Sequence, residues 1–242
     1  MSGIFNTVFY QPLYNGLVFL FDLLPWFDAG IIVILFTFIV KLILFPLSKK
    51  SLTAQAEMKK LEPELKGIRE KYKDNQQETA RRTMELYREH KVNPFASILI
   101  IIIQIPIVFA LYFIFLRAGL PDIKEELLYS FISPPVSVNI LFLGLIDLSA
   151  KSILLAVLAG VSSFFQIRYS LSGNKPKAKT DKPSFRDDLA RSMNMQMKYV
   201  FPLIVAFIAY SISGAVALYW VTSNIFTLGQ ELVIRRKLKK ES

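Results

Sequence analysis

Apolar residues are gathered into five long segments of the chain, at 29–47, 95–116, 150–169, 199–213 and 215–234. A helix needs about 20 apolar residues to cross the ~30 Å hydrocarbon core of a bilayer, so the first three segments and the last are long enough. The fourth is short and fits only as one arm of a tight hairpin with the fifth, turning near Ser213 and Gly214. The backbone of a span must be satisfied internally. The pattern therefore predicts an all-α integral membrane protein with five transmembrane helices.

Charge is distributed unevenly over the segments that join these spans. Residues 1–30 contain no Lys or Arg, and residues 117–149 contain two basic against four acidic side chains. Residues 47–94, residues 168–198 and the tail IRRKLKKES carry a basic excess. Because basic loops stay on the cytoplasmic side, we expect the N-terminus outside, and two large loops and the C-terminus inside. The net charge of +10 thus indicates orientation rather than sequence-specific nucleic acid binding.

These patterns divide the chain into segments of different environment. In order, they are an extra-cytoplasmic interfacial helix, a first span, a cytoplasmic helical hairpin, a second span, an extra-cytoplasmic loop, a third span, a cytoplasmic loop, a fourth span, a fifth span and a basic cytoplasmic tail. The expected bounds in the same order are 1–28, 29–47, 48–93, 94–116, 117–149, 150–169, 170–198, 199–213, 214–234 and 235–242.

The N-terminal stretch QPLYNGLVFLFDLLP is apolar but too short to cross a bilayer. Apolar residues recur at helical spacing between Pro12 and Pro25, while Asn15 and Asp22 fall off that face. This spacing predicts a helix that lies in the outer surface of the membrane. A sixth, degenerate span is the alternative.

Residues 48–93 are rich in helix-forming residues, with apolar positions at helical spacing on both sides of the polar stretch KDNQQ. The pattern predicts two antiparallel helices, roughly 50–72 and 77–91, facing each other through thin apolar stripes. Pro63 should kink or break the first helix. So little apolar surface predicts a mobile hairpin, and a solvated spacer is the alternative.

Polar residues lie inside the predicted spans, where a charge near the bilayer centre costs about 2.5–3.5 kcal/mol. Lys41 interrupts the run FIVKLILFPLSKK, and Gln104 interrupts ILIIIIQIPIVFALYF. In the last span, polar side chains three or four residues apart share one helix face. This polar stripe consists of Trp220, Asn224, Thr227 and Glu231, and it is widened by Tyr219, Ser223 and Gln230.

Structural explanations compete with a functional role for these residues. Lys41 lies on the cytoplasmic side of the middle of its span, and a Lys stem can snorkel. At ~1.5 Å per residue the inner end is still ~9 Å away, which leaves the amine deep. Gln104 can be an ordinary interhelical hydrogen-bonding group, worth under ~1 kcal/mol. A water-filled cavity open to the cytoplasm is the simplest explanation for a deep cation.

The sequence lacks the common catalytic motifs. Its one histidine, His90, lies in the predicted hairpin, it has no Cys, and neither HExxH nor GxxxxGK[ST] occurs. We therefore expect neither an enzyme nor a bound cofactor or metal. A small transporter or channel with a Lys-lined cavity is the alternative function, against which stands the lack of an inverted repeat.

Three longer stretches are specific when they are taken together: TFIVKLILFPLSKK, KYKDNQQETARRTMELYREHKVNPFASILIIIIQIPIVFALYFIF and GAVALYWVTSNIFTLGQELVI. In order and over almost the whole chain, they resemble the YidC-type (YidC/Oxa) membrane protein insertase family in its five-span core form. The resemblance implies a hydrophilic groove in the inner leaflet, open to the cytoplasm and closed toward the outside. It implies an insertase and chaperone that moves polar client tails through this groove and releases client helices into lipid.

The resemblance also assigns residues, partners and a location. Lys41 stands where the family usually has arginine, and Gln104 and Trp220 match polar groove positions. The expected client-binding groove comprises Lys41, Gln104, Trp220, Tyr219, Ser223, Asn224 and Thr227. The implied partners are client membrane proteins and membrane lipid, with the Sec translocon and the ribosome as further candidates; the basic tail is either a ribosome contact or a positive-inside anchor. The implied location is the bacterial cytoplasmic (inner) membrane.

Overall fold

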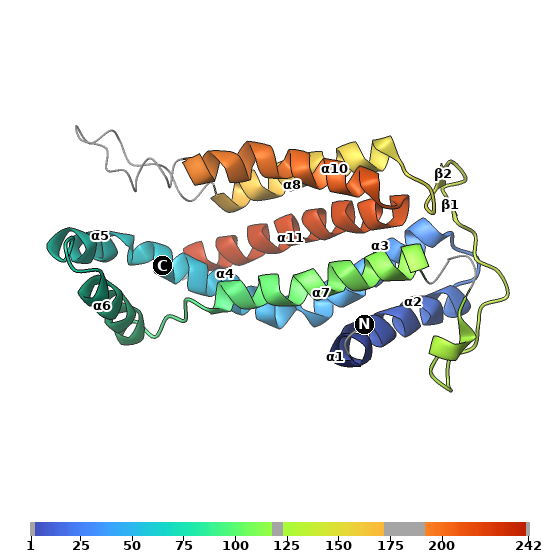
Figure 1. Cartoon of the computed structure of the whole chain (residues 1–242), viewed down its shortest axis with the longest axis horizontal. Coiled ribbons are helices and arrows are strands. Elements are labelled where there is room, and N and C mark those ends of the chain that lie inside the picture. Colours follow the sequence, from blue (N-terminus) through green and yellow to red (C-terminus); the bar gives the residue numbers. More distant parts are fainter. Residues whose placement is uncertain (1–2, 118–122, 172–191, 241–242) are drawn as a thin grey trace. The chain divides into compact units, whose positions relative to one another are not determined.

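The structure, a computed structural model of the chain, describes residues 3–117, 123–171 and 192–240 (Figure 1). The chain forms two compact units. The first comprises Met1–Lys41 and Pro106–Glu231, and the second comprises Leu42–Ile105 and Leu232–Ser242. The first unit therefore holds Lys41 and the polar stripe, whereas Gln104 belongs to the second.

Most of the described residues are helical, which confirms the predicted helical class. The helical elements are α1 (Gly3–Phe5), the π-helix η1 (Asn6–Tyr10), α2 (Gln11–Leu23), α3 (Ala29–Ile43), α4 (Phe45–Lys60), α5 (Glu62–Lys71), α6 (Gln76–Glu89), α7 (Ala96–Arg117), the 3-10 helix η2 (Glu125–Leu127), α8 (Ile153–Leu171), the π-helix η3 (Gln196–Val200), α10 (Phe201–Ser211) and α11 (Gly214–Lys240). An unpredicted antiparallel pair, β1 (Leu141–Phe142) and β2 (Ile146–Asp147), joins them.

Within the described residues, one helix is both long and apolar enough to cross a membrane by itself, namely α8. Helices α3 and α4 meet the same criteria only when they are taken together across the break at Leu44. Helix α10 is 11 residues long, and α11 is longer but carries the polar stripe. Five transmembrane helices therefore stay a prediction.

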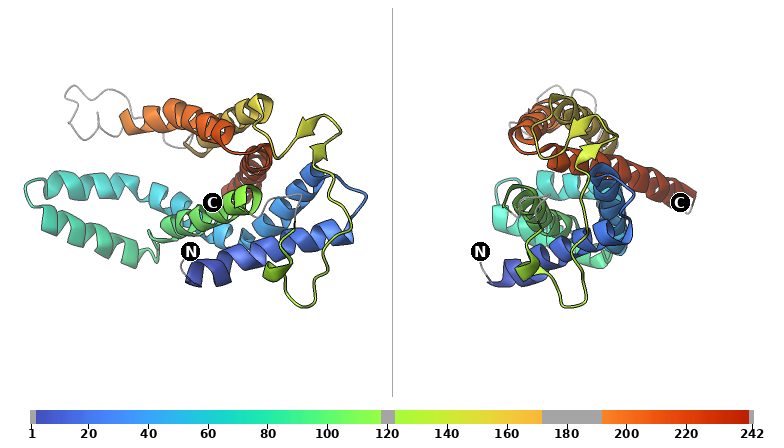
Figure 2. Two further views of the ribbon diagram at one scale, coloured as in Figure 1. Left: turned by 45° about the vertical axis from the view of Figure 1, so that its right-hand side comes forward. Right: turned by 90° about the vertical axis from the view of Figure 1, so that its right-hand side faces the viewer.

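Helices α8 and α10 lie side by side in the first unit (Figures 1 and 2). Gly160 permits this approach, because a Cβ there would lie 2.9 Å from the Cβ of Ala206 and 3.0 Å from the carbonyl oxygen of Pro202. Small residues let membrane helices pack closely, and packing is the main force that holds such helices together. Helix α10 ends at Ser211 and α11 begins at Gly214, so the turn lies where the short apolar segment predicted it.

Helix α2 is buried on more sides than its apolar pattern predicted. Asn15 was expected off the apolar face, yet its side chain is 1% exposed. The loop between α7 and α8 covers it: the Asn15 amide donates to the carbonyl oxygen of Leu127 (2.9 Å) and accepts from the backbone N–H of Tyr129 (2.7 Å). The hydroxyl of Tyr14 accepts from the backbone N–H of Lys124 at 2.8 Å. Long-range hydrogen bonds therefore bury a polar residue that the sequence pattern places off the apolar face.

Asp28 connects the same loop to the start of α3. One carboxylate oxygen caps the helix by accepting from the backbone N–H groups of Gly30 (2.8 Å) and Ile31 (3.0 Å). The other accepts from the backbone N–H of Leu143 at 3.1 Å. Gly30 is required here because any Cβ would overlap the ring of Phe142. An N-cap side chain thus also holds the turn between β1 and β2.

The predicted hairpin lies in the second unit. A break at Leu61, two residues before Pro63, separates α4 from α5, so the proline opens a new helix rather than kinking one. Helices α5 and α6 pack through a small core that matches the predicted thin stripes. Its buried residues are Leu61, Leu65 and Leu86, and Ile68, Tyr87 and Val92 pack partly buried against them.

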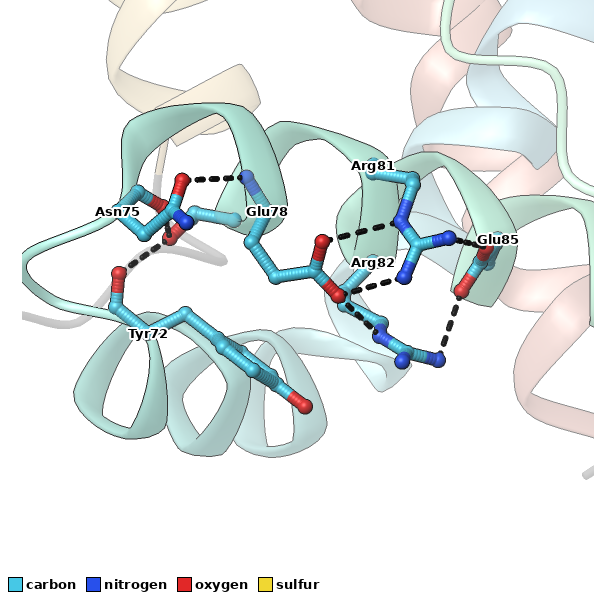
Figure 3. A network of polar contacts seen from close by, with 7 residues as sticks. Tyr72, Asn75, Glu78, Arg81, Arg82 and Glu85 are labelled. Carbon is cyan, nitrogen blue, oxygen red and sulfur yellow. Dashed lines mark hydrogen bonds and ion pairs between the residues drawn. The ribbon is translucent and has the colours of Figure 1, made fainter.

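A charged network covers the first turns of α6 (Figure 3). Asn75 caps the helix by accepting from the backbone N–H of Glu78 at 3.0 Å. The Glu78 carboxylate accepts two hydrogen bonds from Arg81 (2.7 and 3.0 Å) and one from Arg82 (2.9 Å). These hydrogen bonds, from Arg81 first and then Arg82, hold the pKa of Glu78 below its ordinary value. The hairpin therefore combines a small apolar core with a helix cap and exposed ion pairs.

Candidate functional site

Lys41 and Thr227 meet in the first unit. Lys41 lies in the last turn of α3, half-buried, and its Nζ donates to the Oγ1 of Thr227 on α11 at 3.3 Å. The same hydroxyl donates to the backbone carbonyl of Ser223 at 2.8 Å. Because the hydroxyl proton is used by that carbonyl, the oxygen lone pairs face the ammonium. The hydrogen bond from Thr227 to the Ser223 carbonyl thus orients the Thr227 oxygen as an acceptor for the Lys41 ammonium.

An aromatic pair fixes α3 against α11 beside this contact. The rings of Phe38 and Phe226 lie 5.2 Å apart between centroids at 81°, an edge-to-face arrangement. Phe38 is one helical turn before Lys41, and Phe226 is the residue before Thr227. Edge-to-face pairs add about 0.5–1.5 kcal/mol beyond burial. The Lys41–Thr227 contact therefore rests on a defined helix crossing.

A second set of polar residues joins α11 to α8. The amide of Asn224 donates to the hydroxyl oxygens of Ser163 (2.7 Å) and Ser162 (3.1 Å). Two turns further on, the Gln166 amide lies 3.5 Å from a carboxylate oxygen of Glu231. Residues seven apart lie on nearly the same face of a helix. The face of α11 that carries Asn224 and Glu231 therefore packs on α8.

Ser162 and Ser163 were missed by the sequence analysis. Their signal is present as adjacent hydroxyl residues in the apolar stretch VLAGVSSFFQI. Serine is tolerated in membrane helices because its hydroxyl can bond its own helix backbone, and Ser162 does donate to the carbonyl of Ala159 at 3.0 Å. The sequence alone does not reveal that Asn224 of α11 donates its side-chain amide to both serines.

The polar stripe of α11 contacts two different helices. Thr227 contacts Lys41 of α3, whereas Asn224 and Glu231 contact α8. The reason is geometric, because a position three residues from Asn224 is rotated by about 60° around the helix. A stripe that is spread over this angle can contact two neighbouring helices, and it does so here.

The remaining predicted residues lie in different surroundings. Ser223 and Tyr219 are buried, with Tyr219 only 1% exposed, and Trp220 is half-buried. Glu231 is 2% exposed, although it stands near the end of its predicted span. Gln104 lies half-buried in α7, in the second unit, and its role beside Lys41 stays a prediction.

This arrangement offers a cation, hydroxyls and amides rather than reactive groups. Within the described part of the chain, no three His, Cys, Asp or Glu side chains gather to hold a metal ion. Such groups suit the binding of a polar or acidic segment through hydrogen bonds and charge. The site is therefore chemically suited to receiving a polar chain in an apolar setting.

Comparison with known proteins places the chain among membrane proteins. A sequence model of the family described as 60Kd inner membrane protein matches residues 20–241. The chain is 31% identical over 220 residues to the membrane protein insertase YidC of Clostridium tetani, covering 90% of this chain and 86% of that protein. It is 35% identical over 210 residues to the same-named protein of Fusobacterium nucleatum, with 87% of each chain covered.

A longer relative matches over a part of its length. The membrane protein insertase YidC of Citrifermentans bemidjiense is 28% identical over 228 residues, which cover 93% of this chain and 36% of that protein. The similarity to the two shorter relatives extends over most of both proteins.

Proposed function

The chain belongs to the 60Kd inner membrane protein family, the family of the YidC-type membrane protein insertases, and from this premise we propose how it works. Its relatives carry the name membrane protein insertase, and the family points to the bacterial inner membrane and to membrane protein biogenesis. A client segment is thus the substrate to be accommodated, and the polar residues between apolar helices are the groups that would receive it.

We propose the topology that the charge distribution favours. Five helices cross the membrane, with the N-terminus outside and the C-terminus and both basic segments inside. The apolar helix α8, followed by the basic segment 172–191, supports this orientation. The hairpin of α5 and α6 would then lie in the cytoplasm, where its exposed charged faces are solvated and where it would meet clients first.

The polar tail of a client would enter a hydrated groove around Lys41. The observation that carries this proposal is the hydrogen bond between the Lys41 ammonium and the Thr227 hydroxyl, which orients a cation inside the apolar first unit. Ser223 and Asn224 stand within a turn of Thr227, and Trp220 and Tyr219 complete the proposed lining. An acidic client tail would replace hydrogen bonds to water by hydrogen bonds to these side chains.

The groove would lower the cost of moving a polar tail across the inner leaflet. Burying an unpaired polar group costs about 2–7 kcal/mol, and an isolated charge costs far more. A fixed cation, hydroxyls and water in the groove offset that cost, while the client's apolar segment gains by passing into lipid. The membrane potential, worth about 2.3 kcal/mol per charge per 100 mV, would draw an acidic tail outward. No nucleotide is needed for this transfer.

Lys41 would bind acidic tails less rigidly than the arginine usual in the family. A lysine is a compact point charge with rotatable donors, whereas an arginine pairs with a carboxylate in a planar two-point arrangement. The partner hydroxyl of Thr227 compensates by fixing the ammonium. Insertion with either cation at this position is therefore expected.

Insertion of a single-span client with an acidic tail into proteoliposomes tests the proposal. Lys41→Ala should lower the insertion rate by about tenfold or more, the worth of one charge-assisted hydrogen bond, and Lys41→Arg should retain it. Lys49→Ala, at an exposed position on α4, is the matched control and should insert like wild type. Protease protection of the client tail reports insertion in all four proteins, after equal reconstitution is checked.

Two results would contradict the groove. Equal insertion by Lys41→Ala and wild type would make Lys41 a snorkelling residue without a role in transfer. Release of a small trapped solute from the same vesicles in the absence of client would favour a transporter or channel instead.

A further inference from the structure

An apolar groove of about 620 Å³ lies between α8 and α10, away from Lys41 and its partners. Its walls come from α8, η3 and α10, all in the first unit. Several large apolar side chains in these walls are widely exposed, with Phe165 at 55% and Leu203 at 70%. Residues that line it include Gly160, Phe164, Phe165, Tyr199, Leu203 and Ala206.

The groove is built by a close helix contact. Gly160 brings α8 against Ala206 of α10, and both residues lie in the wall of the groove. Val161, exposed by 45%, projects into the resulting channel. An apolar channel on the lipid-facing side of a helix pair suits a flexible hydrocarbon chain.

Two cations stand at one end of this groove. The rings of Phe164 and Tyr199, both in its wall, lie 6.0 Å apart between centroids. The guanidinium of Arg168 lies 5.9 Å from the centre of the Phe164 ring, and the ammonium of Lys198 lies 5.1 Å from the centre of the Tyr199 ring. Each cation is therefore positioned over one ring of a contacting aromatic pair, from two different helical elements.

We propose that this groove binds one anionic phospholipid. An acyl chain would lie along the apolar walls, and the headgroup phosphate would lie between Arg168 and Lys198. Basic pockets between membrane helices recognise anionic headgroups in this way. A hydrophobic client helix would fill the walls as well, but it would bring no negative charge to the two cations. The charge at the end of the groove therefore favours a lipid, independently of the proposed client groove at Lys41.

Native mass spectrometry of the purified protein in detergent tests this assignment, with dioleoyl phosphatidylglycerol and dioleoyl phosphatidylcholine as the probes. Wild type should retain the phosphatidylglycerol about tenfold more strongly, as expected for two cations beside an anionic headgroup. Arg168→Gln with Lys198→Gln should reduce its binding to the level of phosphatidylcholine. Val161→Trp, which fills the channel, should lower the binding of both lipids.

Matched controls separate this site from general lipid contact. Lys151→Gln removes the cation that lies 5.9 Å from the centre of the Tyr210 ring, away from the groove, and should leave the preference unchanged. Leu158→Trp adds the same bulk at an exposed position of α8 outside the groove wall and should also be without effect. Soluble glycerol 3-phosphate should not displace the bound lipid, because it has no acyl chain to fill the apolar walls of the groove.

Three outcomes would overturn the proposal. The first is equal retention of the two lipids by wild type. The second is displacement by glycerol 3-phosphate, which would reduce the site to a headgroup contact. The third is a photo-crosslinker at Leu203 that captures an inserting client helix and no lipid, which would assign the groove to clients. None of these outcomes bears on insertion through Lys41, so the two proposals fail separately.

Discussion

At the scale of single residues, the first unit uses small polar side chains to hold helices together. Asn224 illustrates this, because one amide group reaches two hydroxyls on α8. Between membrane helices there is little hydrophobic drive, so such hydrogen bonds and close packing decide which helices meet. Thr227 likewise forms a hydrogen bond to a neighbouring helix, but its partner, Lys41 of α3, is charged.

Replacing Asn224 by alanine should destabilise the contact between α8 and α11. The loss should be about 1 kcal/mol, because Asn224 makes two interhelical hydrogen bonds and each is worth about 0.6 kcal/mol on average in a membrane. Equilibrium unfolding by sodium dodecyl sulfate in mixed micelles measures it. Ser163→Ala should cost less, because Ser162 still accepts from the amide.

The double variant of Asn224→Ala and Ser163→Ala should cost less than the sum of the two single changes, since both remove the same bond. Strict additivity would mean that the two side chains do not interact, contrary to their 2.7 Å contact.

At the scale of elements, the hairpin of α5 and α6 has a small core and a charged network at the start of α6. Glu78 accepts hydrogen bonds from Arg81 and Arg82, one turn further along α6. It also lies in the first turn of the helix, where a negative charge is favourable. The pKa of Glu78 is lowered, first by its hydrogen bonds to Arg81. A carboxyl whose folded pKa is below its unfolded pKa stabilises the fold above the unfolded value and loses that effect as the pH falls through the folded value.

The hairpin should therefore become less stable when the pH falls below the ordinary pKa of a glutamate. Protonation of Glu78 should account for part of this loss. Hydrogen exchange of the α6 amides, compared at neutral pH and near pH 4 after correction for intrinsic rates, reports the loosening. Glu78→Gln should raise exchange at neutral pH and reduce the difference between the two conditions. Glu89→Gln, at the last residue of α6, is the control. An unchanged acid response in Glu78→Gln would exclude this residue as its origin.

At the scale of the whole molecule, sequence periodicity predicted helices better than it predicted their contacts. The helices at 153–171 and 96–117 and the turn before Gly214 lie close to the predicted segments, because length and apolarity are local properties. The pair β1 and β2 and the partners of Asn224 were not predicted, because they depend on which distant residues meet. Lys41 was singled out by its chemistry alone, and its contact with Thr227 required the structure.

The loop between α7 and α8 shows how distant contacts organise the first unit. It is anchored to α2 through Asn15, to the start of α3 through Asp28, and to the start of α11, where the backbone N–H of Gly214 donates to the carbonyl of Ala150 at 2.8 Å. The described part of the loop, residues 123–152, therefore connects the side of α2 with the starts of α3 and α11. Its hydrogen bonds act together with apolar contacts such as the packing of Phe142 on Gly30.

Asn15→Leu should release one anchor of this loop and leave the others in place. The change removes the hydrogen bonds to the backbone groups of Leu127 and Tyr129, which are partly buried, so the loss should be smaller than the about 1–3 kcal/mol of a fully buried group. Hydrogen exchange in detergent micelles should become faster around residues 124–129 and stay unchanged at Leu143, which Asp28 holds. Tyr14→Phe, which removes one hydrogen bond to Lys124, should give a smaller effect in the same place. Faster hydrogen exchange throughout the loop in Asn15→Leu would mean that the three anchors act as one cooperative unit. Unchanged hydrogen exchange at residues 124–129 in both variants would mean that apolar packing alone holds the loop on α2.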